Sequence, residues 1–472
     1  MSTQQTGSNQ ILTLDGLLEQ TVQIFTGNGE KPTEKKMGIE VEMPFVTKKN
    51  LEPITFSGPK SISAIFNVLA KKCGWETDTI ENGHVTSLKG ESGSITLEPG
   101  GQIEFSSAPR TSLGQLAADV KSYTENLDVV SKKLGVDVLP FGFHPHVAIE
   151  EIPYISERTR FAALKPVFEA ENGYAAWGQS SSVQLTLDGK CMDDSFAAFK
   201  LGLQLQPLAA AMFANSPFSK GEDSGFKTWR RENLLALDSP LYNVPKNIYD
   251  DSYTLKDWAQ HVLNVPMSFV VRNDEYLAVA PKPFIEMIGK PLPELAHLPV
   301  EEQYLTGKDL VDHTTGIKPE MLLKPNQLLE FRAADLGPTP QHWMALGAFW
   351  TGIFYDKDSF KAVQEYVSEW TNDERASFRS SVAKDGLATE IHGKTAQQVA
   401  LDLIEISKQG LAKIEPAAVK MLEVLEDQVK LGITPADVAL KNLADNKGDF
   451  TATMKESLLF SGKKANKGGL SL

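Results

Sequence analysis

Two pairs of glutamates lie on segments that otherwise have the pattern of partly buried strands. Glu40 and Glu42 alternate with apolar residues in KKMGIEVEMPFV, so both should point to one face of a strand. Glu98 and Glu104 flank the Pro-Gly-Gly turn of ITLEPGGQIEFSSAPR. Their even separation across a tight turn predicts that these two carboxylates also share one face of a hairpin.

Two more strand-like segments, SSSVQLTLDG and NQLLEFRAADLGP, add Gln184 and Glu330 to this polar set. If the strands share a sheet, the carboxylates line one surface, where like charges raise one another's pKa and oppose folding unless cations neutralise them. Hard divalent cations prefer oxygen ligands, and Mg²⁺ in nucleotide sites binds a few carboxylates together with substrate phosphates. The pattern therefore favours a Mg²⁺–ATP site on a sheet face. The alternative is a water-facing sheet surface, on which alternating glutamates are ordinary.

Two features beside the glutamates favour a site over a bare surface. The glycines of the Pro-Gly-Gly turn let the backbone approach another group closely. Arg332 follows Glu330 at strand spacing, and Arg230 with Arg231 follows the segment SGFKTW. Arginine suits bidentate binding of phosphate or carboxylate, and a surface ion pair is the alternative for each of these arginines.

Other kinds of site have less support. The sequence contains neither G-x-x-x-x-G-K-[ST] nor G-x-G-x-x-G, so P-loop and Rossmann nucleotide sites are not predicted. His144 and His146 in FGFHPH could bind a metal, but without a third ligand nearby we interpret them as polar residues at a strand end. Cys73 and Cys191 are too few for a disulfide framework and are interpreted as small buried side chains. Trp350 is interpreted as part of the core.

The composition limits the possible partners. The 472-residue chain has 41% hydrophobic residues and a formal net charge of −14. This is typical of a soluble globular protein, and the acidic balance argues against nucleic acid or an anionic membrane as a partner, since phosphates would be repelled. MSTQQTGSNQ lacks the basic and apolar regions of a signal peptide, and no run of about 18 apolar residues could span a membrane. We therefore expect a cytoplasmic protein.

The periodicity of the apolar residues indicates the fold class. Hairpins are predicted at the Pro-Gly-Gly turn and, within 267–280, around Asn273-Asp274. Strands grouped with such turns and flanked by long helices indicate an α+β fold with an antiparallel sheet. Helical spacing predicts helices over 14–27, 61–74, 111–135, 196–218, 343–356, 396–414, 416–432 and 436–445.

Several segments, in order along the chain, resemble the plant and proteobacterial type of glutamate–cysteine ligase, a group that also includes the actinobacterial ligases of ergothioneine biosynthesis. The most specific segments are LEPGGQIEFSSAP and ANSPF. GIEVEMPF, VQLTLD, VPMSFVVR, LLEFRAADLGP and FWTGIFYDKDS add to them, and the resemblance spans roughly residues 37–445.

The resemblance implies a glutamine-synthetase-like fold, in which a curved antiparallel β-sheet flanked by α-helices forms a funnel for ATP and metal. It implies that ATP phosphorylates the γ-carboxylate of L-glutamate and that the amine of L-cysteine attacks the γ-glutamyl phosphate, with two or three Mg²⁺ ions bound. Such phosphoryl transfer depends on charge neutralisation and positioning more than on a covalent catalyst. We expect a monomer or homodimer that binds glutamate, ATP and an amine acceptor.

The resemblance also implies roles for eight residues and a division of the chain. Arg230 and Arg332 would be catalytic and hold a substrate carboxylate or the phosphates, and Gln184 and Arg332 would lie near the metals and the nucleotide. The metal ligands would be Glu40, Glu42, Glu98, Glu104 and Glu330. We expect a disordered N-terminus over 1–12, a catalytic ligase domain over 13–394, a C-terminal helical segment over 395–450 packed on it, and a mobile tail over 451–472.

Some positions depart from the family's pattern. Ser181 and Thr186 stand where the family usually has a cysteine and an asparagine, and RENLLALDS, which includes Leu234, lacks the usual histidine and tryptophan. Because these positions are expected in the substrate pocket, the alternative acceptor is another amino acid or amine, as in specialised metabolism. Two other hypotheses stay open: a non-catalytic binding or regulatory protein, and a guanidine-directed phosphotransferase that releases a phosphorylated product.

Overall fold

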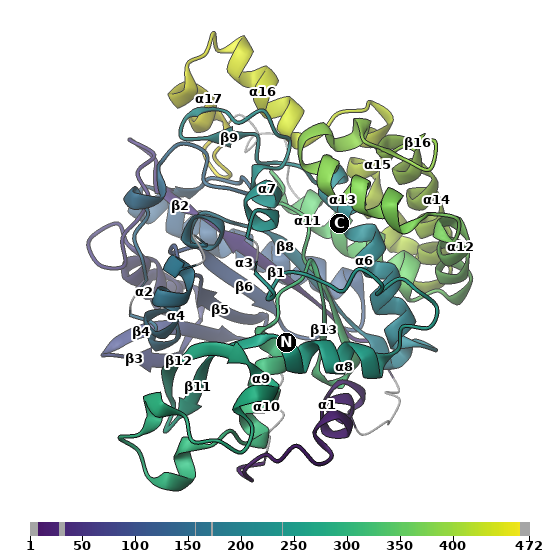
Figure 1. The fold of residues 1–472 in the computed structure, drawn as a ribbon. Coiled ribbons are helices and arrows are strands. Elements are labelled where there is room, and N and C mark those ends of the chain that lie inside the picture. Colours follow the sequence, from purple (N-terminus) through teal and green to yellow (C-terminus); the bar gives the residue numbers. More distant parts are fainter. Residues whose placement is uncertain (1–7, 28–33, 156, 171–172, 238, 463–472) are drawn as a thin grey trace.

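A large antiparallel sheet forms the centre of the molecule (Figure 1). The computed structural model describes residues 8–27, 34–155, 157–170, 173–237 and 239–462. All neighbouring strands of the sheet run antiparallel. In spatial order they are β13 (Met321–Lys324), β14 (Leu328–Phe331), β8 (Val183–Asp188), β1 (Met37–Met43), β6 (Ile103–Ser107), β5 (Gly93–Leu97), β4 (His84–Gly90) and β3 (Glu76–Glu81).

The alternation of side chains along the central strands separates an apolar face from a polar face. On β1, Ile39, Val41 and Met43 are buried in the main core, and the two glutamates between them point the other way. The apolar face packs against four helices: α2 (Ile62–Cys73), α3 (Leu113–Leu134), α6 (Ser195–Met212) and α11 (Pro340–Phe354). The predicted α+β class with an antiparallel sheet flanked by helices is confirmed.

Aromatic side chains fill the space between the sheet and α11. The ring of Trp350 stacks on that of Phe331 with centroids 4.5 Å apart, and both residues are buried. The interpretation of Trp350 as core is therefore confirmed. Residues of α14 (Ala396–Ile414) and α15 (Glu423–Lys430) join the same core cluster, and Figure 1 shows these helices beside the sheet with α12 (Lys357–Val367) and α13 (Asn372–Asp385).

The remaining elements lie around this centre. The hairpin of β11 (Pro266–Arg272) and β12 (Glu275–Pro283) turns at Asn273 and Asp274, whose φ angles of 49° and 64° suit a tight hairpin turn and confirm the predicted one. The other elements are α1 (Leu17–Thr26), β2 (Phe45–Thr47), β7 (Val136–Val138), α4 (Thr159–Ala170), α5 (Tyr174–Gly178), β9 (Phe218–Ser219), β10 (Glu222–Asp223), α7 (Trp229–Leu235), α8 (Leu255–Asn264), α9 (Phe284–Met287), α10 (Gly307–Gly316), β15 (Glu390–Ile391), β16 (Lys394–Thr395), α16 (Pro435–Asp445) and α17 (Phe450–Ser457). The helix predicted over 416–432 is instead a 3₁₀ helix over Pro416–Leu422 followed by α15.

The N-terminus was predicted to be disordered over 1–12 and the tail to be mobile over 451–472, but part of each segment packs against the rest of the fold. Leu12 is buried, and its N–H group donates to the carbonyl of Leu305 at 2.9 Å. Helix α17 occupies the start of the predicted tail and buries Met454 against the cluster that contains Phe141. Burial of these apolar side chains explains both differences. Residues 1–7 and 463–472 lie outside the described residues.

None of the helices in the described ranges is both long enough and apolar enough to cross a membrane.

Candidate functional site

A cavity of about 790 Å³ opens on the polar face of the central sheet. The residues singled out from the sequence come from β1, β6, β8, α7, the turn after β5, and β14 with the residue that follows it. All eight of them line this cavity: Glu40, Glu42, Glu98, Glu104, Gln184, Arg230, Glu330 and Arg332. The structure therefore brings the predicted side chains together, and their individual roles stay predictions.

The register of the sheet explains why these side chains meet. Glu42 on β1 lies directly opposite Glu104 on β6. Glu40 lies opposite Gln184 on β8, and Glu330 on β14 lies opposite Thr186 on the other edge of β8. Directly opposed residues point to the same face of a sheet, so the period of two along each strand places these groups on one surface.

The Pro-Gly-Gly turn packs against protein backbone and so does not need a ligand to explain its glycines. A Cβ atom added to Gly100 would lie 1.8 Å from the carbonyl oxygen of Gly178, at the end of α5. The side-chain amide of Gln102 donates to the carbonyls of Trp177 at 3.0 Å and Ser180 at 2.6 Å. The backbone of the turn thus approaches α5 closely, as its glycines predicted, and this packing fixes the turn beside Glu98, which lines the cavity.

The five glutamates that line the cavity form an acidic wall: Glu40, Glu42, Glu98, Glu104 and Glu330. Basic side chains of the protein compensate the charge of Glu40 and Glu330. The carboxylate of Glu330 accepts a hydrogen bond from Arg332 and forms an ion pair with Lys324. Burial alone would raise the pKa of Glu40, but the charges of Lys324 and Arg332 lower it to about 2. Basic side chains of the protein therefore favour the ionised form of Glu40, and they form ion pairs with Glu330.

The other half of the wall is less fully compensated, because the charges of Arg230 and Arg332 at Glu42, and of Arg158 and Arg160 at Glu98, do not offset the effects that raise the pKa of these carboxyls. Burial raises the pKa of Glu42, and burial together with the charges of Glu104 and Glu42 raises the pKa of Glu98 well above its usual range. Burial and the neighbouring Glu40 and Glu42 raise the pKa of Glu104 to about 7. No Lys or Arg among the described residues forms an ion pair with Glu42, Glu98 or Glu104. Among the described residues, hydroxyl and amide groups donate to Glu42 and Glu104, such as Thr96, which donates to Glu104 at 2.6 Å.

This difference bears on the predicted metal ligands. As the side chains stand, no three His, Cys, Asp or Glu residues in the described part of the chain are close enough together to hold one metal ion. Glu42 is buried, Glu98 and Glu104 are half-buried, and these three mutually repelling carboxylates nevertheless have the donor chemistry that a hard divalent cation requires. Glu42, Glu98 and Glu104 therefore fit a metal, whereas Glu330 is committed to Lys324 and Arg332.

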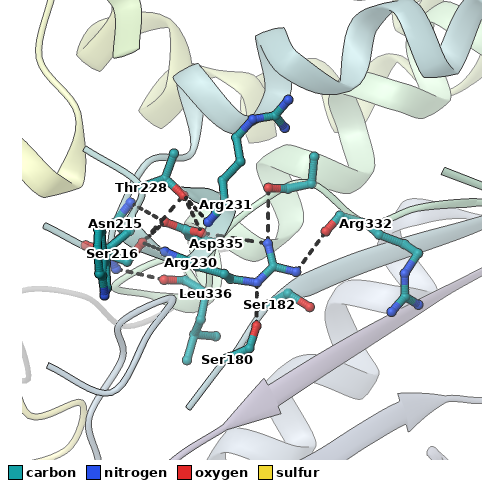
Figure 2. Close-up of polar contacts among 12 residues, drawn as sticks. Ser180, Ser182, Asn215, Ser216, Thr228, Arg230, Arg231, Arg332, Asp335 and Leu336 are labelled. Atoms are coloured by element: carbon teal, nitrogen blue, oxygen red, sulfur yellow. Dashed lines mark hydrogen bonds and ion pairs between the residues drawn. The ribbon is translucent and has the colours of Figure 1, made fainter. Parts of the chain in front are cut away.

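Arg230 is held by the protein at three points (Figure 2). Its Nε donates to Ser180 Oγ at 2.8 Å, Nη1 to the carbonyl of Ala333 at 3.3 Å, and Nη2 to the carbonyl of Arg332 at 3.1 Å. Three of the five guanidinium N–H groups are thus used to fix Arg230 against the chain that leaves β14. Any substrate contact depends on the two that remain.

Asp335 organises the other side of Arg230 (Figure 2). This buried carboxylate accepts hydrogen bonds from Asn215 N at 2.9 Å, Ser216 Oγ at 2.7 Å and Thr228 Oγ1 at 3.1 Å. Its Oδ1 lies 3.8 Å from Arg230 Nη1. Because Thr228 is also the N-cap of α7, Asp335 links the start of that helix to Arg230.

Sequence periodicity missed most of the basic side chains in the cavity. Lys324 ends β13, and Lys318 lies on the irregular chain just before that strand. Arg231 and Arg379 both form ion pairs with Glu320, which joins α7 to α13. Arg231 was singled out from the sequence beside Arg230, whereas Lys318, Lys324 and Arg379 were not, because the local pattern of their segments carries no signal of a shared site.

The positions that depart from the expected family pattern are not all in the cavity. Ser181 is fully buried and does not line it, because strand alternation points its side chain away from the face that carries Ser182 and Gln184. The hydroxyl of Thr186 donates to Glu330 at 3.5 Å but is not part of the lining either. Leu234 does line the cavity. The expectation that all three residues lie in the substrate pocket is therefore wrong for Ser181 and Thr186 and right for Leu234.

His144 and His146 also lie outside the cavity. Their rings are 5.0 Å apart, and burial lowers the pKa of His144 to about 3. Neither belongs to a group of three metal-binding side chains within the described residues.

Comparisons with known proteins agree on one family. The model described as "Glutamate-cysteine ligase family 2" matches residues 36–457. The chain is 33% identical to glutamate–cysteine ligase B, chloroplastic, of Oryza sativa subsp. japonica over 436 residues, which cover 91% of this chain and 85% of that protein. It is 32% identical to the chloroplastic glutamate–cysteine ligase of Solanum lycopersicum over 439 residues, which cover 92% and 82% of the two chains.

A solved structure supports the fold. The crystal structure of glutamate–cysteine ligase from Francisella tularensis in complex with AMP has a TM-score of 0.55 with this chain at 12% sequence identity. The match covers 93% of this chain and 90% of the other.

Proposed function

Because this chain belongs to glutamate–cysteine ligase family 2, we propose that it is an ATP-dependent ligase that joins the γ-carboxylate of L-glutamate to the amine of L-cysteine. The observation that supports this activity is a single cavity with a carboxylate wall and a set of basic side chains. The proposed substrates are all anionic or zwitterionic. A site that binds them together must neutralise charge on both the nucleotide and the amino acids.

The proposed reaction has two steps. An oxygen of the γ-carboxylate attacks the γ-phosphorus of ATP, the bond to the bridging oxygen breaks, and ADP leaves. The acceptor amine then attacks the carbonyl carbon of γ-glutamyl phosphate, the amine loses a proton, and inorganic phosphate leaves as the amide forms. Neither step needs a covalent bond to the protein, so positioning and charge compensation are the tasks left to the cavity.

The basic residues would act on the phosphates and on a substrate carboxylate. Lys324 at the end of β13 and Arg332 just after β14 both form ion pairs with Glu330 and would stabilise negative charge on the transferred phosphoryl group. Arg230, fixed by Ser180 and Asp335, would present its remaining N–H groups to a carboxylate or phosphate.

The acidic residues would hold magnesium. Glu42, Glu98 and Glu104 form no ion pair with any Lys or Arg that the structure describes, and bound Mg²⁺ would neutralise charge on the triphosphate. Two or three ions are predicted from the family, and Glu40 and Glu330 would contribute once their basic partners contact the substrate. The cytoplasmic location and the monomeric or homodimeric state also stay predictions.

A different acceptor is the second candidate. Leu234 and Leu235 on α7 line the cavity together with Trp177, whose indole N–H donates to the hydroxyl of Tyr242 at 2.9 Å. The two leucines belong to the segment that lacks the family's usual histidine and tryptophan, and this section would accept an amine substrate bulkier or less polar than cysteine.

The test is ADP release by the purified protein. The proposed function predicts that ADP release requires glutamate, Mg²⁺ and cysteine together, and that γ-glutamylcysteine is formed. Glu104→Gln should lower kcat/KM on the order of 100-fold or more, while Glu76→Gln at an exposed position of β3 should leave it unchanged. A panel of amino acids and amines identifies another acceptor. Nucleotide binding without turnover by any of them would contradict the ligase assignment.

A further inference from the structure

The basic side chains of the cavity differ in whether the protein itself neutralises them. Six of them form an ion pair with a carboxylate: Arg158, Arg230, Arg231, Lys324, Arg332 and Arg379. Arg160 lies over the ring of Phe269 at 5.9 Å. Lys318 is the remaining one, and its ammonium group has no ion pair or hydrogen bond with any described residue.

The backbone fixes Lys318 at this position. It lies between α10 and β13, and its N–H group donates to the carbonyl of Leu241 at 2.7 Å. Leu241 itself lines the cavity. The lysine side chain therefore extends into the cavity from a segment that is held in place by the chain following α7.

The surroundings of the ammonium group are predominantly positive. Burial and the charges of Arg332, Arg160 and Lys324 hold the pKa of Lys318 well below its usual range, and Glu98 provides a smaller opposing effect. Lys318 is half-buried, and a cation withdrawn from water without a counter-ion is costly in the free protein. That cost becomes a source of affinity when an anion enters, because the new hydrogen bond is charge-assisted and shielded from water.

We propose that Lys318 binds an oxyanion of a substrate, either a carboxylate of one of the amino acids or a phosphate of ATP, and thereby selects that substrate. This inference rests on the proposed function, since it assigns a ligand-binding role within the same cavity. The protein supplies no carboxylate for Lys318, so the substrate would complete the ion pair.

Kinetics of Lys318→Met and Lys318→Arg distinguish the possible ligands. Methionine keeps the length of the side chain and removes its charge, so the KM of one substrate should rise roughly 10- to 100-fold, the range for a lost hydrogen bond to a charged group. Arginine should restore most of the affinity. A rise confined to glutamate or to the acceptor identifies a carboxylate, and one confined to ATP identifies a phosphate. Lys246→Met, at an exposed position outside the cavity, is the matched control.

Thermal unfolding separates ligand binding from a structural role. Without ligands, Lys318→Met should have a Tm equal to or above that of the wild type, because it removes a half-buried charge that lies among other positive charges. The increase in Tm caused by the bound substrate should be smaller in this variant. A structural lysine would show the opposite, a lower Tm with an unchanged ligand effect.

Direct binding keeps this proposal separate from the proposed function. Calorimetry with glutamate, cysteine and ATP is carried out on wild type and Lys318→Met, whether or not ADP is released. Failure of ADP release with every acceptor refutes the ligase activity. Equal affinity of both proteins for all three ligands, or no binding of any of them by the wild type, overturns the role of Lys318.

Discussion

Replacing Glu104 with glutamine should remove a pH-dependent destabilisation of the metal-free protein. Glu104 lies directly opposite Glu42, and burial together with the charges of Glu40 and Glu42 raises its pKa from 4.5 to about 7. A carboxyl group with a higher pKa in the folded state binds its proton more tightly there. Its stabilising contribution is complete below pH 4.5 and is lost as the pH rises towards 7.

The size of the effect follows from the pKa of Glu104. A rise from 4.5 to about 7, at about 1.4 kcal/mol per pKa unit, corresponds to a loss of about 3 kcal/mol in unfolding free energy, which is constant above pH 7. Glutamine has the same shape and no titration. In the absence of metal, the variant should therefore match the wild type near pH 4.5 and be more stable by about 3 kcal/mol at pH 8.

Urea unfolding of EDTA-treated protein at pH 5 and pH 8 measures this difference, followed by the same measurement with Mg²⁺. Mg²⁺ at 100 times its dissociation constant should stabilise the wild type by about 2.7 kcal/mol, and the Glu104→Gln variant by less. Glu76→Gln, at an exposed position, should behave as the wild type.

Two results would refute this reasoning. One is a parallel pH dependence of stability in wild type and Glu104→Gln. The other is equal stabilisation of both proteins by Mg²⁺, because a carboxylate that binds the metal cannot be replaced without reducing that stabilisation.

Three further predictions concern the residues around the site. Asp335→Asn should lower the unfolding free energy by about 3 kcal/mol or more, because a buried ion-pair partner and hydrogen-bond acceptor is lost. The same change should raise the KM for glutamate. An unchanged urea midpoint would contradict this prediction. Burial lowers the pKa of His313 to about 4, so this residue should cost about 3 kcal/mol of stability as the pH falls from 6.5 to 4, and His313→Asn should flatten that part of the urea-unfolding profile. Gly100→Ala should lower Tm and kcat/KM because its Cβ would collide with Gly178, whereas Gly114→Ala, with ordinary contacts, should change neither; equal Tm values would contradict the packing of the turn.

Local patterns in the sequence were sufficient to predict the acidic wall. Side chains alternate between faces along any strand, so GIEVEM by itself places Glu40 and Glu42 together, and the hairpin geometry does the same for Glu98 and Glu104. The hairpin at Asn273-Asp274 and the ends of the long helices were also predictable, because turn and capping preferences act over a few residues. These features depend on neighbours in the chain.

Charge compensation, in contrast, was decided by the tertiary structure. The spatial order of β13, β14, β8 and β1 brings Lys324 and Arg332 to Glu330, while no described cation forms an ion pair with Glu98. Lys318 and Asp335 acquire their surroundings from segments far away in the sequence. The sequence determined which face of each strand is acidic because that property is local. Only the fold decided which carboxylates form ion pairs and which cation of the cavity has no ion pair with a described residue, because electrostatic interactions depend on distance in space and on burial.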